Sequence, residues 1–256
     1  MAALISSMEE SKQVSKKTHT NQQLIPYQWL WTNVYGERMG FVEWVKSRPF
    51  SILFLIIAWS IIGTLGFAST RNCDETWQLA FACDRAIWMI KMITEPLNYV
   101  MSWFTAPFFH NGLDHILFVS IFGFMLPVQS FEVQNGTKST VIIFFISYIF
   151  FGIFFGIFFN VGLVYWPDVE FFSFGFERNW MGGSVGFYAL IGALAYTSRK
   201  PWFLLMLIAC FEVINLMVIG IDVHISFIHV MSATSGFITC MILKKKRILA
   251  ANQHLK

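Results

Sequence analysis

Residues 179–193 read NWMGGSVGFYALIGA, and this stretch opens a strongly apolar segment that ends near Tyr196. Two glycines and a serine are unusual residues at the start of a helix that would otherwise face lipid. A helix N-terminus presents backbone N–H groups that have no partner within the helix. We therefore expect Gly182, Gly183 and Ser184 to build a polar site at one end of a membrane helix.

The composition outside this stretch also indicates an integral membrane protein. The chain has 256 residues, of which 56% are hydrophobic and 13% are charged, whereas soluble domains average about 25% charged residues. The apolar residues fall in long blocks, as expected for segments that cross a bilayer. The net charge of +3 is small and scattered, which argues against a nucleic-acid partner.

Six segments are apolar and long enough to cross a bilayer, for which about 20 residues are needed. The sequence therefore predicts an all-α, polytopic fold, with a six-transmembrane-helix domain over residues 50–243. We expect residues 1–49 to form a cytoplasmic tail with an interfacial helix, its first 24 residues being disordered, and residues 244–256 to form a basic cytoplasmic tail. The six segments cover residues 50–69, 112–131, 141–165, 180–196, 201–221 and 225–243.

Lys and Arg residues are concentrated in the loops that lie on one side of this arrangement. They precede the first segment, follow the second and fourth, and form a cluster at residues 244–247. By the positive-inside rule we predict a multi-pass protein of the cell membrane with both termini in the cytoplasm. The loop at residues 70–111 then lies outside, where Cys73 and Cys83 can form a disulfide; the spacing alone leaves that pairing open.

Ionisable residues within a bilayer are costly and often mark functional sites. Ser184 lies about four residues into the fourth segment and His229 about four residues into the sixth. Both segments run in the same direction, so at about 1.5 Å per residue the two side chains lie at a similar depth. A histidine at hydrogen-bond distance can activate a serine as a nucleophile.

The neighbouring residues suit such a pair. Tyr188 lies one turn after Ser184 and can pack on the His229 imidazole, and small residues let the two helices approach closely. Gly182 and Gly183 leave space for a substrate carbonyl beside the helix N-terminus, where N–H groups can stabilise negative charge. His115, near the start of the second segment, is a candidate second donor.

Each residue taken alone also has a purely structural explanation. An intramembrane serine usually bonds the carbonyl one turn back, and glycine pairs usually serve packing. We expect His224 and Asp222 to be loop residues, and we expect Asp114 to cap the second segment rather than take part in chemistry.

Three stretches carry a family resemblance: HNGLDHILF (110–118), GGSVGFYALIG (182–192) and HVMSATSGF (229–237). In these motifs the chain resembles the rhomboid intramembrane serine proteases over residues 50–243. The resemblance implies Ser184 as nucleophile, His229 as general base, and His115 and His110 as the paired histidines of the second helix. It also implies transmembrane protein substrates in the lipid bilayer, cleaved near their outer ends without a metal or cofactor.

The chain departs from the family pattern at several positions. Val119 replaces an asparagine that donates a hydrogen bond to the oxyanion, Val185 replaces the glycine after the nucleophile, and a Trp-Arg pair of the first outer loop is absent. Losing one oxyanion donor typically costs about 10²–10³ in rate. The alternative is therefore a slow or inactive rhomboid-like protein that binds membrane-protein clients. A transporter is a weaker third hypothesis, because the sequence shows no internal repeat.

Overall fold

The structure is a computed structural model that describes residues 26–253, without the side chains of Ile219 and residues 246–253. The first 24 residues, for which we predicted a disordered tail, therefore lie outside the described residues. The elements in chain order are α2 (Phe41–Ser47), α3 (Pro49–Leu65), α4 (Trp77–Arg85), β1 (Ile87–Trp88), α5 (Lys91–Thr94), α6 (Pro96–Thr105), η1 (Ala106–Phe108), α7 (Leu113–Phe118), η2 (Val119–Val128), α8 (Gln129–Asn135), α9 (Thr137–Tyr165), α10 (Glu170–Glu177), β2 (Asn179–Trp180), α11 (Ser184–Thr197), α12 (Pro201–Ile214), η3 (Asn215–Ile219) and α13 (Val223–Gln253).

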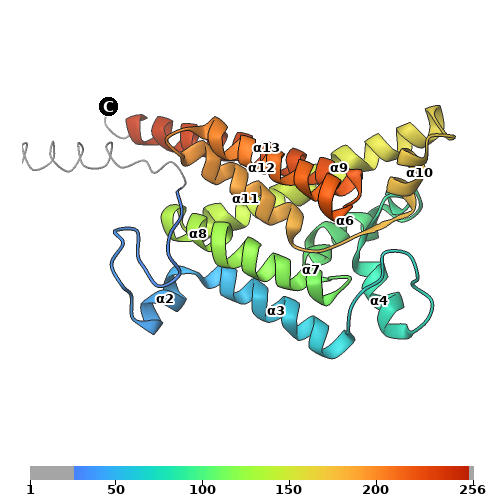
Figure 1. Ribbon diagram of the computed structural model, residues 1–256, viewed down its shortest axis with the longest axis horizontal. Coiled ribbons are helices and arrows are strands. Elements are labelled where there is room, and N and C mark those ends of the chain that lie inside the picture. Colours follow the sequence, from blue (N-terminus) through green and yellow to red (C-terminus); the bar gives the residue numbers. More distant parts are fainter. Residues whose placement is uncertain (1–25, 254–256) are drawn as a thin grey trace, which may run out of the picture.

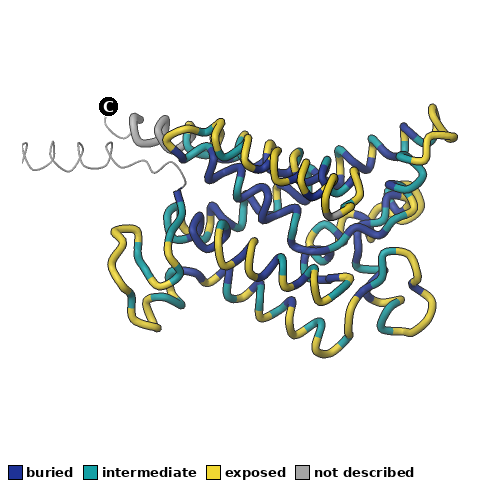
Figure 2. Tube along the Cα trace, viewed as in Figure 1, coloured by how far each residue is buried: buried dark blue, intermediate teal, exposed yellow. Residues whose placement is uncertain are grey.

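The long helices form a bundle with α11 at its centre (Figure 1). α13, α9 and the α7–η2–α8 segment all pack on α11. Ten of the 14 residues of α11 are buried, and the trace through the middle of the bundle is correspondingly the most buried part (Figure 2). A helix in this position contacts other helices rather than lipid.

The structure supports an all-α membrane protein but not the predicted count of six spanning helices. Among the described residues, four helices are long and apolar enough to cross a membrane, or five if the bent pair α2–α3 counts as one span. The four cover Leu113–Asn135, Thr137–Tyr165, Pro201–Val218 and Val223–Lys245. The segment predicted at residues 180–196 is shorter than expected: α11 has 14 residues, or about 21 Å, against about 30 Å of hydrocarbon.

The bend of 86° between α2 and α3 has a sequence cause. Pro49 is the first residue of α3, where its missing N–H is harmless. Glu132 of α8 accepts hydrogen bonds from the Phe50 and Ser51 N–H groups at 2.8 and 2.9 Å. A carboxylate at a helix N-terminus is favourable, so Glu132 ties the start of α3 to α8.

The loop predicted outside the membrane folds into short helices at one end of the bundle. Cys73 and Cys83, whose pairing the spacing left open, form a disulfide. α6 packs on α9, where the Tyr99 hydroxyl donates to the Gly152 carbonyl at 2.6 Å. The disulfide therefore closes part of the loop on itself, and the contact of Tyr99 with α9 anchors the loop to the bundle.

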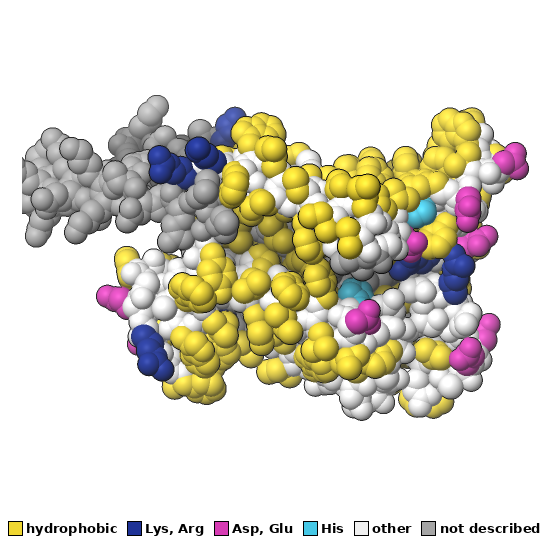
Figure 3. Space-filling model, in the orientation of Figure 1, with side chains coloured by type: hydrophobic (Ala, Val, Ile, Leu, Met, Phe, Trp, Pro, Cys, Tyr) yellow, Lys and Arg dark blue, Asp and Glu magenta, His cyan; other side chains and the backbone are white. Residues whose placement is uncertain are grey.

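The surface is hydrophobic along the helices, and charged side chains gather toward the two ends of the molecule (Figure 3). Both ends of the described chain lie at the same end of the bundle (Figure 1). The residues for which we predicted a basic C-terminal tail continue helix α13 as far as Gln253. Charges at both ends of an apolar bundle are the distribution expected of a multi-pass membrane protein.

Candidate functional site

Ser184 is the first residue of α11, and its half-buried side chain lines a cavity. The segment before it is not helical: Asn179–Trp180 pairs with Ile87–Trp88 as two short antiparallel strands. Gly182 then takes φ +98°, a conformation that residues with a Cβ rarely adopt. The helix therefore begins four residues later than the predicted Trp180, and Ser184 lies at its N-terminus.

His229 lies in the second turn of α13, and glycine contacts hold this helix against α11. A Cβ on Gly236 would lie 1.8 Å from the Ala189 carbonyl oxygen, and a Cβ on Gly192 would lie 1.8 Å from that of Ala233. Small residues thus permit the close approach that the sequence predicted, and Gly192 is the α11 glycine at this contact. Gly186 instead meets Phe144 of α9.

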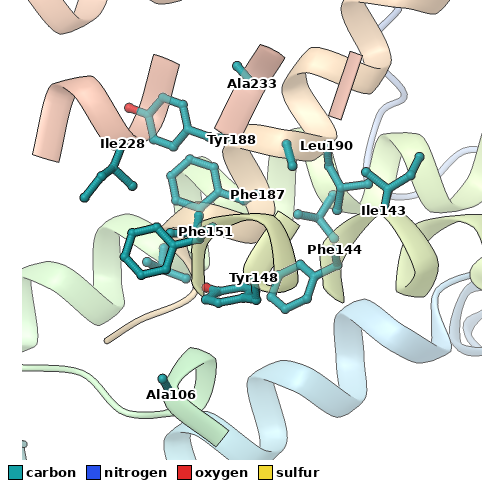
Figure 4. Close-up of a cluster of buried hydrophobic side chains, with 14 of the residues drawn as sticks. Ala106, Ile143, Phe144, Tyr148, Phe151, Phe187, Tyr188, Leu190, Ile228 and Ala233 are labelled. Carbon is teal, nitrogen blue, oxygen red and sulfur yellow. The ribbon is translucent and has the colours of Figure 1, made fainter. Parts of the chain in front are cut away.

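The close approach places Tyr188 of α11 on the imidazole of His229. The ring centroids are 3.9 Å apart and the planes differ by 9°, which is the stacking that the sequence predicted. The Tyr188 side chain lies among Ile228, Phe187 and Phe151 in the close-up (Figure 4). Packing on both sides restricts the rotation of the ring and hence the plane of the imidazole.

Glu212 of α12 contacts both of these residues, and the sequence reasoning overlooked it. The His229 Nδ1 atom lies 3.1 Å from Glu212 Oε1, and the Tyr188 hydroxyl donates to the same oxygen. The signal was present in the sequence, because Glu212 is the only acidic residue in the apolar run 201–221 and an acid in a spanning segment is a candidate functional residue by default.

A cavity of about 500 Å³ is lined by five of the seven candidate residues, the exceptions being Gly183 and His110. Its wall is mostly apolar, with polar groups from the loop at residues 70–111 and from the segment before α11. Both Ser184 and His229 line the cavity, and among the described residues no hydrogen bond joins them. The lining includes Ser184, His229, Tyr188, His115, Gly182, Val185, Asn111, Arg178, Asn215, Phe118, Phe211 and Ile225.

The N–H groups of the two glycines are not free, contrary to our expectation for an oxyanion site. The Gly182 N–H donates to the Ala106 carbonyl at 3.0 Å, and the Gly183 N–H donates to His110 Nε2 at 3.5 Å. Within the part of the chain that the structure describes, the N–H groups of Ser184 and Val185 have no such partner. The free donors at this helix N-terminus are therefore one or two residues further along the chain.

His115 lies directly against the turn that precedes Ser184. A Cβ on Gly182 would lie 2.3 Å from His115 Cε1, so glycine is required there by both space and backbone conformation. His115 Nδ1 lies 2.7 Å from Asn111 Oδ1, and this contact fixes the orientation of the ring. Asn111 also lines the cavity, although the sequence assigned it no role.

His110 is buried behind His115, with ring centroids 4.9 Å apart. Burial lowers the pKa of this loop histidine to about 3, because the charged form cannot be solvated there. A neutral imidazole can accept the Gly183 N–H at Nε2. His110 therefore supports the turn before Ser184 and does not line the cavity.

Val119 occupies the position where the resemblance would place an asparagine. Its side chain is fully buried, and its Cγ1 would lie 3.0 Å from a Cβ on Gly183. The position is thus beside the turn that precedes Ser184, but the side chain that fills it is apolar. The valine side chain therefore offers no hydrogen bond to the cavity.

We expected both His224 and Asp222 in a loop, and the structure confirms this only for Asp222, whose side chain is 45% exposed. His224 is the second residue of α13 and is buried; its ring stacks on Phe171 at 4.1 Å, and its Nε2 lies 2.8 Å from the Phe171 carbonyl oxygen. Asp222 pairs with Arg178 at 2.7 Å. Asp114 lies in the first turn of α7 and does not cap it, since the N-cap residue is Gly112.

Comparison with known protein families, with curated proteins and with solved structures gives no match. The functional argument therefore depends on the chemistry and geometry of the cavity.

Proposed function

We propose that this protein is an intramembrane serine protease of rhomboid type, with Ser184 as nucleophile and His229 as general base. The observation that carries the proposal is the shared cavity: Ser184 and His229 line it together, and Tyr188 and Glu212 hold the imidazole. A nucleophile, a base, and groups that orient the base are the parts of a serine hydrolase site.

The reaction follows from these groups. Ser184 Oγ attacks the carbonyl carbon of a peptide bond while its proton moves to His229 Nε2, and negative charge develops on the carbonyl oxygen. The N–H groups of Ser184 and Val185, which have no partner in the described structure, stabilise that oxygen. The C–N bond then breaks, His229 returns the proton to the leaving amine, and water hydrolyses the acyl-enzyme by the reverse roles.

The substrate class follows from the wall of the cavity and its place in the bundle. Most of the lining is aromatic or aliphatic, and it lies at one end of helices that suit a bilayer. We infer that the substrates are transmembrane segments of other proteins, cleaved near the outer ends of those segments without a metal or cofactor. The same proposal places a multi-pass protein in the cell membrane with both termini in the cytoplasm, supported by the position of both ends of the described chain at one end of the bundle (Figure 1).

A fluorophosphonate probe in detergent tests the dyad directly, because it reacts only with an activated serine. We expect the wild type to be labelled, and Ser184→Ala and His229→Ala to lose labelling. Ser235→Ala is the matched control: this half-buried α13 serine bonds the Ser232 carbonyl at 2.8 Å and should label as wild type. Equal labelling of the wild type and Ser184→Ala, or no labelling of any protein, contradicts the proposal.

A second candidate function is a non-catalytic relative that binds membrane-protein clients in the same cavity. It is favoured by the apolar Val119, by the Gly182 and Gly183 N–H groups that are already engaged, and by the absence, in the described part of the chain, of a hydrogen bond between Ser184 and His229. This hypothesis expects no labelling of the wild type, together with specific crosslinking of apolar peptides in the cavity.

Val119→Asn separates a slow enzyme from an inactive one. The asparagine amide would supply a donor beside Gly183, so we expect the labelling rate to rise, by up to about 10²–10³-fold if a full oxyanion contact is gained. Val119→Leu fills the position without a donor and is the control. An unchanged rate in Val119→Asn with intact folding argues that this position does not face the reacting oxygen.

A further inference from the structure

The position of Glu212 makes its charge unfavourable in free energy unless the carboxylate has partners. Its side chain is 3% exposed in a helix that is apolar enough to cross a bilayer. A buried carboxylate is tolerated only when donors or a cation satisfy it. Oε1 has the Tyr188 hydroxyl and His229 Nδ1 as partners, while Oε2 has no hydrogen-bond partner among the described residues.

The contact at Nδ1 determines which nitrogen of His229 is basic. An ionised carboxylate only accepts hydrogen bonds, so Nδ1 carries the proton and donates it to Glu212. Nε2 then holds the lone pair and is the nitrogen available to Ser184. The stacked Tyr188 ring fixes the plane of the imidazole, and the Tyr188 hydroxyl fixes the carboxylate from the other side.

We propose that Glu212 is a positioning residue that completes a Ser184–His229–Glu212 triad. It holds His229 in the tautomer that can accept the Ser184 proton, and its negative charge stabilises the imidazolium that forms when the proton moves. The inference rests on the proposed function and deepens it, since in a Ser184–His229 dyad no protein group determines which nitrogen of His229 is protonated. Glu212 itself stays ionised throughout and exchanges no proton.

The other charged and titratable groups around the cavity do not duplicate this charge. His115 approaches from α7 and carries no negative charge, and Tyr188 from α11 is a donor. Asp222 is paired with Arg178 at 2.7 Å. Asp114, the one acidic residue among those that line the cavity, is exposed at the start of α7. Glu212 is thus the only acid in the described structure that bonds to the imidazole.

The rival explanation is that Glu212 only ties α12 to α11 and α13. In that case Glu212 would act only on the folding of the helices, and an uncharged residue of the same shape would keep the same contacts. Glu212→Gln is therefore the informative variant, because its carbonyl oxygen can still accept from Tyr188 and from Nδ1. It removes the charge while keeping the connection, and Glu212→Asp keeps the charge with a shorter side chain.

The test measures fluorophosphonate labelling rate against pH for the wild type, Glu212→Gln and Glu212→Asp, with thermal unfolding of each. We expect Glu212→Gln to unfold near the wild-type temperature, to label about 10³–10⁴-fold more slowly, and to shift its acid limb by about 1–2 pH units toward lower pH. Glu212→Asp should recover most of the rate. If Glu212→Gln labels at the wild-type rate with the wild-type pH profile, the triad is overturned and the dyad stays in place. The same holds if Glu212→Gln and Glu212→Asp lose labelling rate equally and the pH profile does not move.

A measurement that does not need catalysis keeps the inference separate from the proposed function. The ¹⁵N shifts of His229 in the resting protein report its tautomer, and we expect Nδ1–H with Nε2 unprotonated at neutral pH. Retention of the Nδ1–H tautomer in Glu212→Gln, whose carbonyl oxygen can still accept from Nδ1, together with slower labelling supports a role for the charge. Protonated Nε2 in the neutral wild-type imidazole overturns it even where the probe labels Ser184, whereas absence of labelling in the wild type removes the protease proposal and the triad with it.

Discussion

Replacing either glycine at the contact between α11 and α13 should disable the site from a distance. Ser184 is on α11 and His229 is on α13, so the spacing of the two helices sets the distance between the proposed nucleophile and the proposed base. Gly192→Ala and Gly236→Ala each add one methyl group at this contact. Neither glycine lines the cavity, so an effect on reactivity must act through the helix positions.

The magnitude follows from the contact distances. Each added Cβ would lie 1.8 Å from a backbone carbonyl oxygen, whereas ordinary van der Waals contact begins at 3.4 Å. Backbone cannot rotate away as a side chain can, so the helices must separate by about 1.6 Å. Overpacking of this kind typically costs about 1–3 kcal/mol, and a displacement of about 1 Å can cost about 10²-fold in rate.

The assay combines thermal unfolding in detergent with the rate of fluorophosphonate labelling. We expect each variant to lose about 1–3 kcal/mol in stability and to label about 100-fold more slowly. Gly63→Ala on α3 is the matched control, because a Cβ there meets no atom within 4 Å, and it should be neutral or slightly stabilising. Wild-type unfolding and labelling in both contact variants would refute the argument that close packing sets the site.

Three further predictions concern the surroundings of the site. Gly182→Ala should destabilise the protein more than Gly36→Ala. Both glycines have positive φ, which costs about 1–2 kcal/mol in a residue with a Cβ, but of the two only a Cβ on Gly182 would meet a neighbour, His115 Cε1 at 2.3 Å. Equal unfolding temperatures of the two variants would contradict this. Replacing Cys73 and Cys83 by Ser should cost about 2–4 kcal/mol, measured by unfolding against the exposed Cys210→Ser control, and no loss would show that the loop is held by packing alone. Burial lowers the pKa of His110 to about 3, below its unfolded value of about 6.5. The stabilising contribution of neutral His110 is therefore complete above pH 6.5 and falls by up to about 1.4 kcal/mol per pH unit as the pH drops toward 3. In His110→Asn the unfolding temperature should depend less on pH over this range, and an unchanged dependence would contradict the assignment.

The membrane character and the position of the helices could be predicted from the sequence, because hydropathy and helical period are local properties. The stacking of Tyr188 on His229 was also predictable. Tyr188 lies four residues after Ser184, and the matching depth of His229 in its own helix places it beside them. Boundaries were less accurate where a turn intervenes. The strand pair and the positive φ of Gly182 start α11 at Ser184, which no hydropathy profile detects.

The partners of each polar group depended on tertiary structure. Glu212 is 17 residues from His229 and 24 from Tyr188, and whether it faces them depends on how α12 is rotated about its own axis. The engagement of the Gly182 and Gly183 N–H groups likewise depends on η1 and on His110, which come from another part of the chain.

Local sequence therefore determined that this is a helical membrane protein with a serine and a histidine at one level. Only the packing of separate helices decided that an acid orients the histidine and which donors remain free. The physical reason is that hydrogen-bond partners across helices are set by interhelical spacing and rotation, which arise from all contacts together. One observation would remove the foundation of the site: an experimental structure in which Ser184 and His229 open into different cavities.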